Sequence, residues 1–322
     1  MRWLTLGFLA GLQFFNHAAF ADELKIFVIK PKVRIDWSNP RDLAITSGLD
    51  SSGNDYAPIG HFAVQVTCSQ QNQYGVRSVL TGMERQDKRL SRKITIDEKL
   101  GLGSLFYAFK GQLETKSSTL TELKEALTQQ RLKIISVPTS PARCEAMLDF
   151  IDQWIASGSY EVYGGGKNVA EGEGSGCADF AMKLFEIATW SNPPSDWIVK
   201  INVPKSLIGD GKKKKVSFTA MLERNAWAYS GEPQTPFAIP DSNLVWDWLN
   251  QHTQNSGMKP YQYTKHLFPN GLIYNSDDPN AFQTAVREAA NELPGSPKES
   301  KFEFHYLTNK KPTVVWNSIK AF

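Results

Sequence analysis

Gly60-His61-Phe62-Ala63-Val64-Gln65-Val66-Thr67-Cys68 is the stretch that decides the fold predicted for this chain. Its polar and apolar side chains alternate with a period of two, which is typical of a β-strand in a sheet. A polar turn follows, and residues 74–83 return as a second strand, so the two segments predict a hairpin. His61 and Ala63 share one face of the first strand, and Cys68 lies on the opposite face.

A second stretch, Gly172-Glu173-Gly174-Ser175-Gly176-Cys177-Ala178-Asp179-Phe180, places a cysteine at the start of a predicted amphipathic helix. The helix follows a glycine-rich loop over residues 164–176. A helix N-terminus carries about half a positive charge, which favours a thiolate and lowers the pKa of Cys177. Its free N–H groups can also hold an oxyanion. Gly174, Ser175 and Gly176 are therefore the predicted substrate-binding residues, because glycine lets a substrate backbone approach closely.

A nucleophilic cysteine needs a base, and His61 is the candidate. Ala63 is small, so a helix can pack close to the imidazole. A histidine at the end of a core strand, facing the start of a core helix, is the arrangement of cysteine hydrolases. Ser78, Thr81 and Glu84 on the returning strand are candidates for a third residue that orients the imidazole. The alternative is that the cysteine and histidine are ordinary buried residues of the core.

The other two cysteines are Cys68 and Cys144. Cys144 falls in the first turn of a helix predicted over residues 141–156, with Ser140 as its cap and Pro141 at its first position. In an oxidising compartment these two cysteines could form a disulfide, which would leave Cys177 as the free thiol. The alternative is that all three are reduced and buried.

Periodicity and turn residues predict the remaining organisation. We expect a strand over residues 24–35 that Pro31 interrupts, a loop over 36–58, a helix over 120–129 and a short strand over 133–137. We also expect a hairpin of residues 197–203 and 215–221 around a turn at 209–212, a helix over 281–293 and a strand over 302–307.

The first 21 residues have the three regions of a secretory signal peptide. Arg2 supplies the positive start, residues 3–15 are mostly apolar, and Ala19-Phe20-Ala21 fits the cleavage rule. The apolar run is shorter than the roughly 20 residues that a membrane span needs. We therefore expect cleavage after Ala21 and a mature protein that is periplasmic or extracellular, without a stable membrane span.

Composition excludes several other classes. The chain of 322 residues carries 36 lysines and arginines and 33 acidic residues, a balance that does not suggest a nucleic-acid binder. It contains neither an HExxH nor a CxxC motif, so it gives no support to a zinc site. We predict no metal and no cofactor.

The order of these segments resembles the circularly permuted papain-like families related to the NlpC/P60 peptidases. The matching residues are 60–64 and 175–180, with residues 137–140 leading into a helix and Tyr160 before the loop. The resemblance implies an α+β fold whose antiparallel sheet packs on the cysteine-bearing helix, with Cys177 as nucleophile and His61 as base. No third residue matches clearly, and the segment 85–119 and the residues after 230 lie outside it.

Three regions follow: a signal peptide over residues 1–21, a catalytic domain over 22–230, and a C-terminal extension or small accessory region over 231–322. The resemblance implies a cysteine hydrolase of amide bonds, and an exported enzyme of this kind would most simply cleave the stem peptides of peptidoglycan. One alternative is a noncatalytic protein that binds the cell envelope. Another is an acyltransferase or lipid-ester hydrolase that uses the same Cys–His pair.

Overall fold

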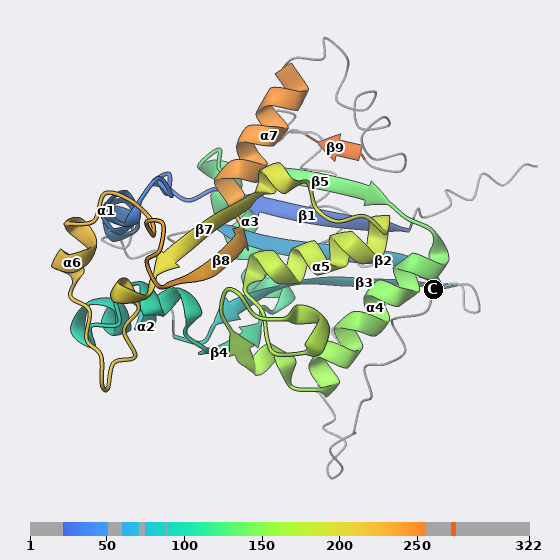
Figure 1. The fold of residues 1–322 in the computed structure, drawn as a ribbon. Coiled ribbons are helices and arrows are strands. Elements are labelled where there is room, and N and C mark those ends of the chain that lie inside the picture. Colours follow the sequence, from blue (N-terminus) through green and yellow to red (C-terminus); the bar gives the residue numbers. More distant parts are fainter. Residues whose placement is uncertain (1–21, 51–59, 71–74, 88, 255–271, 275–322) are drawn as a thin grey trace, which may run out of the picture.

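The computed structural model describes residues 22–50, 60–70, 75–87, 89–254 and 272–274. Its centre is an antiparallel sheet with the strand order β6-β4-β3-β2-β1-β5-β9 (Figure 1). The strands are β1 (Glu23–Ile29), β2 (His61–Gln70), β3 (Gly75–Arg85), β4 (Phe109–Leu113), β5 (Leu132–Pro138), β6 (Val162–Tyr163) and β9 (Leu272–Tyr274). The predicted hairpin is confirmed, since β2 and β3 pair with Ala63 opposite Gly82.

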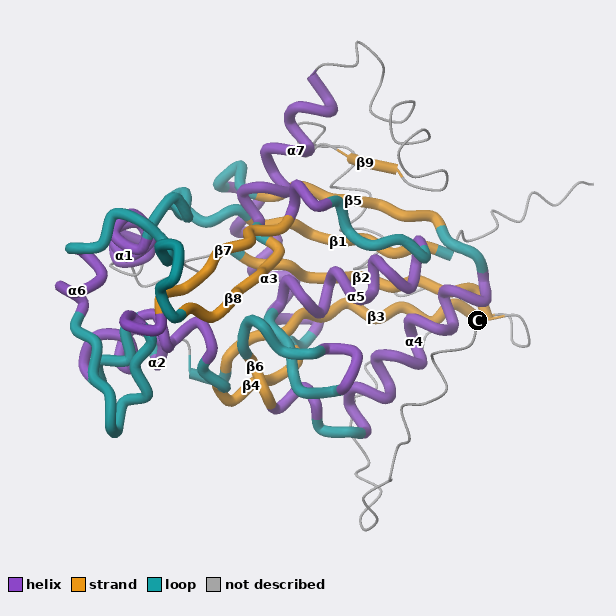
Figure 2. Tube along the Cα trace, viewed as in Figure 1, coloured by secondary structure: helices purple, strands orange, loops and turns teal. Residues whose placement is uncertain are grey.

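Helices cover both faces of this sheet (Figures 1 and 2). The helices α4 (Pro141–Ala156) and α5 (Cys177–Thr189) pack on the face that carries Phe62, Val64 and Val66. The helix α3 (Lys116–Thr128) packs on the opposite face, where Ala63 and Leu80 lie. This arrangement follows from strand alternation, because both sets of side chains are buried. An α+β fold with an antiparallel sheet against the cysteine-bearing helix is therefore confirmed.

Local capping signals place the two helices that matter most for the site. Ser140 accepts a hydrogen bond from the N–H of Arg143 at 3.4 Å and starts α4, with Pro141 in the first turn. Gly176 is the N-cap of α5, so Cys177 is its first helical residue. At the other end Trp190 takes a left-handed conformation and ends the helix. Both predicted helices are confirmed.

A second layer lies beside the end of the sheet where β2 begins (Figure 1). It consists of the ribbon of β7 (Ile198–Pro204) and β8 (Gln234–Pro240), with α1 (Pro40–Asp50) and α6 (Phe218–Leu222). These elements share an apolar cluster that includes Leu43, Val203, Met221 and Phe237. The remaining helical segments are α2 (Leu90–Arg92), α7 (Ser242–Gln254), and the short turns Lys93–Asp97, Leu102–Phe106, Ser159–Glu161, Val169–Glu171, Ser195–Trp197 and Lys205–Leu207.

The prediction of a loop over residues 36–58 is wrong where α1 stands. Asn39 and Pro40 look like loop residues, but here they cap and open a helix. The side-chain oxygen of Asn39 accepts from the N–H of Asp42 at 2.9 Å. Leu43 and Ala44 then bury against the second layer. The rest of the predicted loop, residues 51–59, lies outside the described residues.

The predicted pairing of residues 197–203 with 215–221 is also wrong. The first segment does form β7, but its partner is β8, with Ile201 opposite Phe237. Residues 218–222 form α6 because Ser217 caps it, accepting from the N–H of Ala220 at 3.1 Å. Alternation over a few residues could not reveal this, since a cap and a buried face decide the helix.

The chain after residue 230 continues into the same core. The helix α7 buries Val245 and Leu249 in the cluster beneath α5, and the ring of Trp248 lies 5.4 Å from that of Trp197. The helix predicted over 281–293, the strand over 302–307 and the signal peptide over 1–21 lie outside the described residues. Among the helices that are described, none has the length and apolar character needed to cross a membrane.

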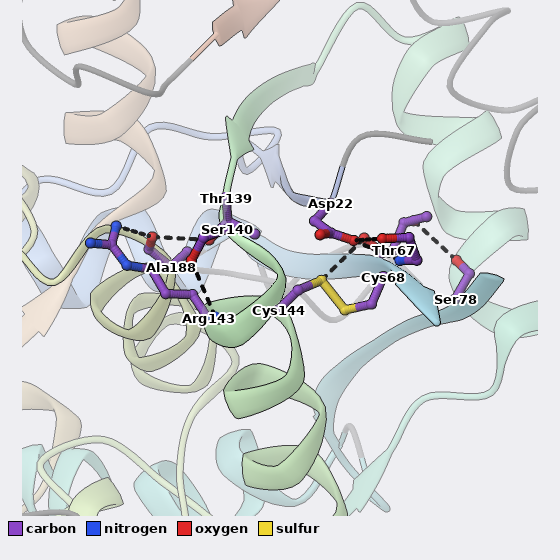
Figure 3. Close-up of a disulfide and its surroundings, with 10 residues drawn as sticks. Asp22, Thr67, Cys68, Ser78, Thr139, Ser140, Arg143, Cys144 and Ala188 are labelled. Carbon is purple, nitrogen blue, oxygen red and sulfur yellow. Dashed lines mark hydrogen bonds between the residues drawn. A yellow bond between two sulfur atoms is a disulfide. The ribbon is translucent and has the colours of Figure 1, made fainter. Parts of the chain in front are cut away.

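The structure joins Cys68 and Cys144 in a disulfide (Figure 3). Cys177 is left as a free, buried cysteine. The bond ties the end of β2 to the first turn of α4, with 5.6 Å between the two Cα atoms. Beside it, Asp22 accepts hydrogen bonds from the N–H and hydroxyl of Ser69, at 2.6 and 2.8 Å. These contacts hold the sheet and α4 together at the end remote from His61.

Replacing Cys68 and Cys144 together by serine should lower the free energy of unfolding by about 2–4 kcal/mol, because the bond closes a loop between residues 76 apart in sequence. Urea titration of the variant and of the wild type, each with and without reductant, measures this difference. The matched control Cys177→Ser should leave the effect of reductant unchanged. Equal stability of oxidised wild type and double variant would contradict the prediction.

Candidate active site

Cys177 and His61 meet where α5 and β2 both begin. The thiol is buried and takes part in a hydrogen bond with the imidazole. The N–H of Phe62 donates to the same sulfur, and the hydroxyl of Tyr163 donates to it from 3.6 Å. Because Cys177 is the first residue of α5, the positive end of the helix dipole also acts on the sulfur. The site therefore surrounds a thiolate with donors.

The imidazole of His61 has an acidic partner on its other side. The Oε1 atom of Glu114 lies 2.8 Å from Nε2 of His61, and Oε2 of Glu122 lies 3.9 Å away. The Glu114 oxygen is off the line of the ring N–H, so the contact is an ion pair and not an aligned hydrogen bond. Both side chains are withdrawn from solvent, at 8% exposure for His61 and 2% for Glu114. A buried pair at this distance interacts far more strongly than one on the surface.

The register of the sheet places Glu114 beside His61. Glu114 directly follows β4, and its N–H donates to the carbonyl of Gly82 on β3 at 2.9 Å. The hydroxyl of Thr119 donates to the Glu114 carboxylate at 3.0 Å, and that of Thr81 donates to its carbonyl at 2.9 Å. Gly82 is required here: a Cβ at that position would stand 2.9 Å from the carboxylate and 3.2 Å from Nε2 of His61.

These contacts set the protonation of the three groups. Burial alone would lower the pKa of His61, but the negative charges of Glu114, Glu122 and Cys177 raise it well above its ordinary value. Burial would raise the pKa of Cys177, yet the charge and hydrogen bond of His61 and the donors from Tyr163 and Phe62 lower it. Burial and the neighbouring thiolate raise the pKa of Tyr163, so its hydroxyl stays a donor. Both shifts favour the thiolate and imidazolium form of the pair, which is the reactive form.

The helices pack on the two faces of β2 differently from the prediction. Ala63 does lie beside a helix, but that helix is α3, which packs on it with Leu123 and Ala126. The cysteine-bearing α5 covers the opposite face, against Phe62 and Val64. Cys177 reaches the imidazole because both residues lie at the edge where β2 starts, beyond the first β2–β3 pair, Ala63 and Gly82.

None of the three predicted orienting residues contacts His61. Glu84 accepts a hydrogen bond from Gln112 at 2.7 Å, and Ser78 bonds with Gln65 and Thr67. Thr81 acts one step away, by holding the carbonyl of Glu114. The predicted candidates all lie on β3, next to β2, whereas the carboxylate beside His61 comes from the end of β4, one strand further. Glu114 lies in the segment 85–119. It could have been identified only by knowing that β4 pairs with β3.

Of the three predicted substrate-binding residues, Gly176 alone borders a cavity with Cys177. Gly174 has a φ of 105° and lies against Val162, where a Cβ would clash. Ser175 is fully buried, and its N–H donates to the carbonyl of Val162 at 3.1 Å. These two residues shape the loop, and Gly164 and Gly165 face the cavities instead. Tyr163 was not predicted either, since a single tyrosine in a two-residue strand has no sequence signal.

Asp179 completes the start of α5. It occupies the third helical position, and its carboxylate accepts from the N–H of the N-cap Gly176, which is one half of a capping box. One of its carboxylate oxygens, Oδ2, is nevertheless buried, and burial raises the pKa of Asp179 from 3.8 to about 7. The N–H of Gly176 is therefore engaged. The N–H groups of Cys177 and Ala178 have no acceptor within the helix and can face an oxyanion.

Two cavities meet at Cys177 and His61. A small one of about 40 Å³ touches Cys177, Gly176 and Phe62. A larger one of about 220 Å³ touches His61 and Glu114 and extends toward α1 and α6. Tyr163 and Gly165 border both cavities. A substrate held across them would present its reacting carbonyl to the sulfur in the small cavity and extend into the large one.

His61, Glu114 and Glu122 are also the donors that could hold a divalent cation, because their ligand atoms lie within 4.8 Å of one another. An ion there would take the Nε2 atom and block protonation of the ring at that position. The arrangement thus serves either a cation or the acid–base pair, but not both at once.

No protein-family model matches the chain, and no curated protein or solved structure is detectably similar to it. The resemblance to permuted papain-like families therefore stays a prediction from the sequence.

Replacing Glu114 by glutamine should lower the pKa of His61 and raise that of Cys177, because the negative charge beside the imidazole is lost. The rate of alkylation of Cys177 by iodoacetamide, followed against pH by peptide mass, should shift to higher pH. Glu84→Gln is the matched control, since Glu84 bonds Gln112. Identical profiles for Glu114→Gln and wild type would contradict the role of Glu114.

Asp179→Asn should make the protein relatively more stable as the pH rises. Unfolded Asp179 ionises near 3.8, whereas the folded residue keeps its proton up to about pH 7. The wild type therefore loses stability between these values, and each pKa unit corresponds to about 1.4 kcal/mol. Urea unfolding from pH 4 to pH 8 should show a growing difference from the variant. The exposed Asp149→Asn control should show none, and a constant difference for Asp179→Asn would refute this reading.

Proposed function

We propose that this protein is a cysteine hydrolase of amide or ester bonds. The observation that carries the proposal is the buried arrangement of Cys177, His61 and Glu114 at the start of α5. It supplies a thiolate, an imidazolium next to it and a carboxylate that stabilises the imidazolium. The three parts come from three separate segments of the chain.

The chemistry follows from these positions. The thiolate of Cys177 attacks the substrate carbonyl, and the oxyanion that forms faces the N–H groups at the start of α5. His61 gives its proton to the leaving amine or alcohol, and an acyl thioester remains on Cys177. His61 then takes a proton from a water molecule that attacks the thioester, which releases the acid and restores the thiolate.

The finer fold and the location are part of this proposal. We propose a permuted papain-like core, supported by a histidine strand that precedes a cysteine helix packed on an antiparallel sheet. We propose export, with cleavage after Ala21, supported by the amino-terminal sequence and by the bond between Cys68 and Cys144. An exported amidase would meet peptidoglycan, so its stem peptides are the first substrate to test.

The second candidate is acyl transfer or lipid-ester hydrolysis by the same pair. The large cavity favours it, because most of its wall is apolar, with Leu43, Phe218 and Ile239 among the lining residues. The third hypothesis is a noncatalytic protein that binds the cell envelope. The carboxylate of Glu114 beside His61 favours the catalytic proposal over it.

Cys177→Ala should abolish turnover of peptide, amide and ester substrates, and His61→Ala should lower kcat by about 10²–10⁴-fold. Mass spectrometry of the intact protein should find an acyl adduct on wild type and none on Cys177→Ala. Matched far-UV circular dichroism spectra would show that the variants fold, and a chelator should leave the activity in place. Undiminished turnover by Cys177→Ala would contradict the proposal.

A further inference from the structure

We propose that the large cavity binds the apolar acyl chain of the substrate, of medium length, while the scissile carbonyl lies at Cys177. This inference rests on the proposed function and gives its substrate class: medium-chain acyl amides or esters. It is argued from the position, the lining and the size of the cavity.

The position of the cavity suits an acyl chain whose carbonyl lies at the sulfur of Cys177. Tyr163 and Gly165 line both the small cavity at Cys177 and the large one beyond it. Gly165 leaves the passage open toward β8, since a Cβ there would stand only 3.1 Å from the Phe237 ring. A carbonyl at Cys177 therefore has its substituent directed past these residues.

Most of the cavity wall is apolar. His61, Glu114 and Glu122 gather at the end near the sulfur, and Arg85 and Arg92 also line the cavity. Leu43, Ala44 and Met221 lie toward the second layer, and all three belong to its apolar cluster. A molecule with one polar reacting group and an apolar tail matches this mostly apolar wall.

The volume of the cavity indicates the length of the acyl chain that it can hold. An apolar protein cavity of about 150 Å³ holds a benzene molecule, which has six carbon atoms. The cavity of about 220 Å³ is about half as large again, so it has room for about eight or nine carbon atoms. An acetyl group would leave it mostly unfilled, and a palmitoyl chain would exceed it.

Gly48 on α1 offers a way to fill the cavity without straining the fold. It lines the cavity, and a Cβ added there would meet only the ring of Phe218, at an ordinary 3.7 Å. Glycine inside a helix is unfavourable relative to residues with side chains, so Gly48→Leu should not weaken α1. Ile45 on the same helix is exposed and does not line the cavity, so Ile45→Phe is the matched control.

The experiment compares kcat/KM for p-nitrophenyl acetate, octanoate and palmitate with wild type, Gly48→Leu and Ile45→Phe. Wild type and Ile45→Phe should prefer octanoate to the other two esters by at least tenfold. Gly48→Leu should lose most of that preference, which is a ratio measured within the same variant. Equal kcat/KM for acetate and octanoate in the wild type, or an unchanged preference in Gly48→Leu, would overturn the inference.

Binding to Cys177→Ala separates this inference from the proposed function. Calorimetric titration with octanamide and acetamide requires no turnover. Tighter binding of octanamide that Gly48→Leu abolishes supports the cavity assignment even if no variant turns over any ester, in which case the proposed function fails alone. Turnover by the wild type with no difference between the two amides would overturn the cavity assignment and leave the proposed function standing.

Discussion

The contact between the sulfur of Cys177 and the imidazole of His61 is the interaction on which the site depends. It requires that α5 begin at the edge where β2 begins, and that both charges be kept from water. Burial opposes each charged form, so the pair persists only because each charge has its own partners. Glu114 and Glu122 stabilise the imidazolium, while Phe62, Tyr163 and the start of α5 stabilise the thiolate. The pKa of the thiol is lowered in spite of burial for this reason.

Several structural features serve that contact from a distance. Gly82 leaves the space that Glu114 and His61 occupy together, and Thr119 and Thr81 fix Glu114 at its position. At the far end of β2 the disulfide to α4 and the contacts of Asp22 with Ser69 hold the other end of the sheet. The helix α5 packs between these two regions, on a face of the sheet that is mostly apolar near its centre. A shift of α5 along the sheet would therefore disturb packing as well as the site.

In the proposed function, the second layer determines which substrate the site accepts. Its elements come from widely separated parts of the chain, since α1 precedes β2 and β8 follows α5. Together they line the large cavity beside His61. Under the proposed function, the same sheet and helix with a different second layer would hold the same thiolate but receive a different acyl group. The proposal thus assigns the chemistry and the choice of substrate to separate parts of the structure.

The sequence by itself determined the elements whose signals are local: the β2–β3 hairpin from its alternation, α4 from Ser140 and Pro141, and α5 from its apolar stripe. It also identified Cys177 and His61 as candidates, because a cysteine at a helix start and a histidine at a strand start have recognisable neighbours. Only the tertiary structure brought Glu114 and Tyr163 to that pair, paired β7 with β8, and enclosed a cavity. Those features depend on which strands pair and in what register, and strand pairing is decided by the burial of side chains far apart in the chain.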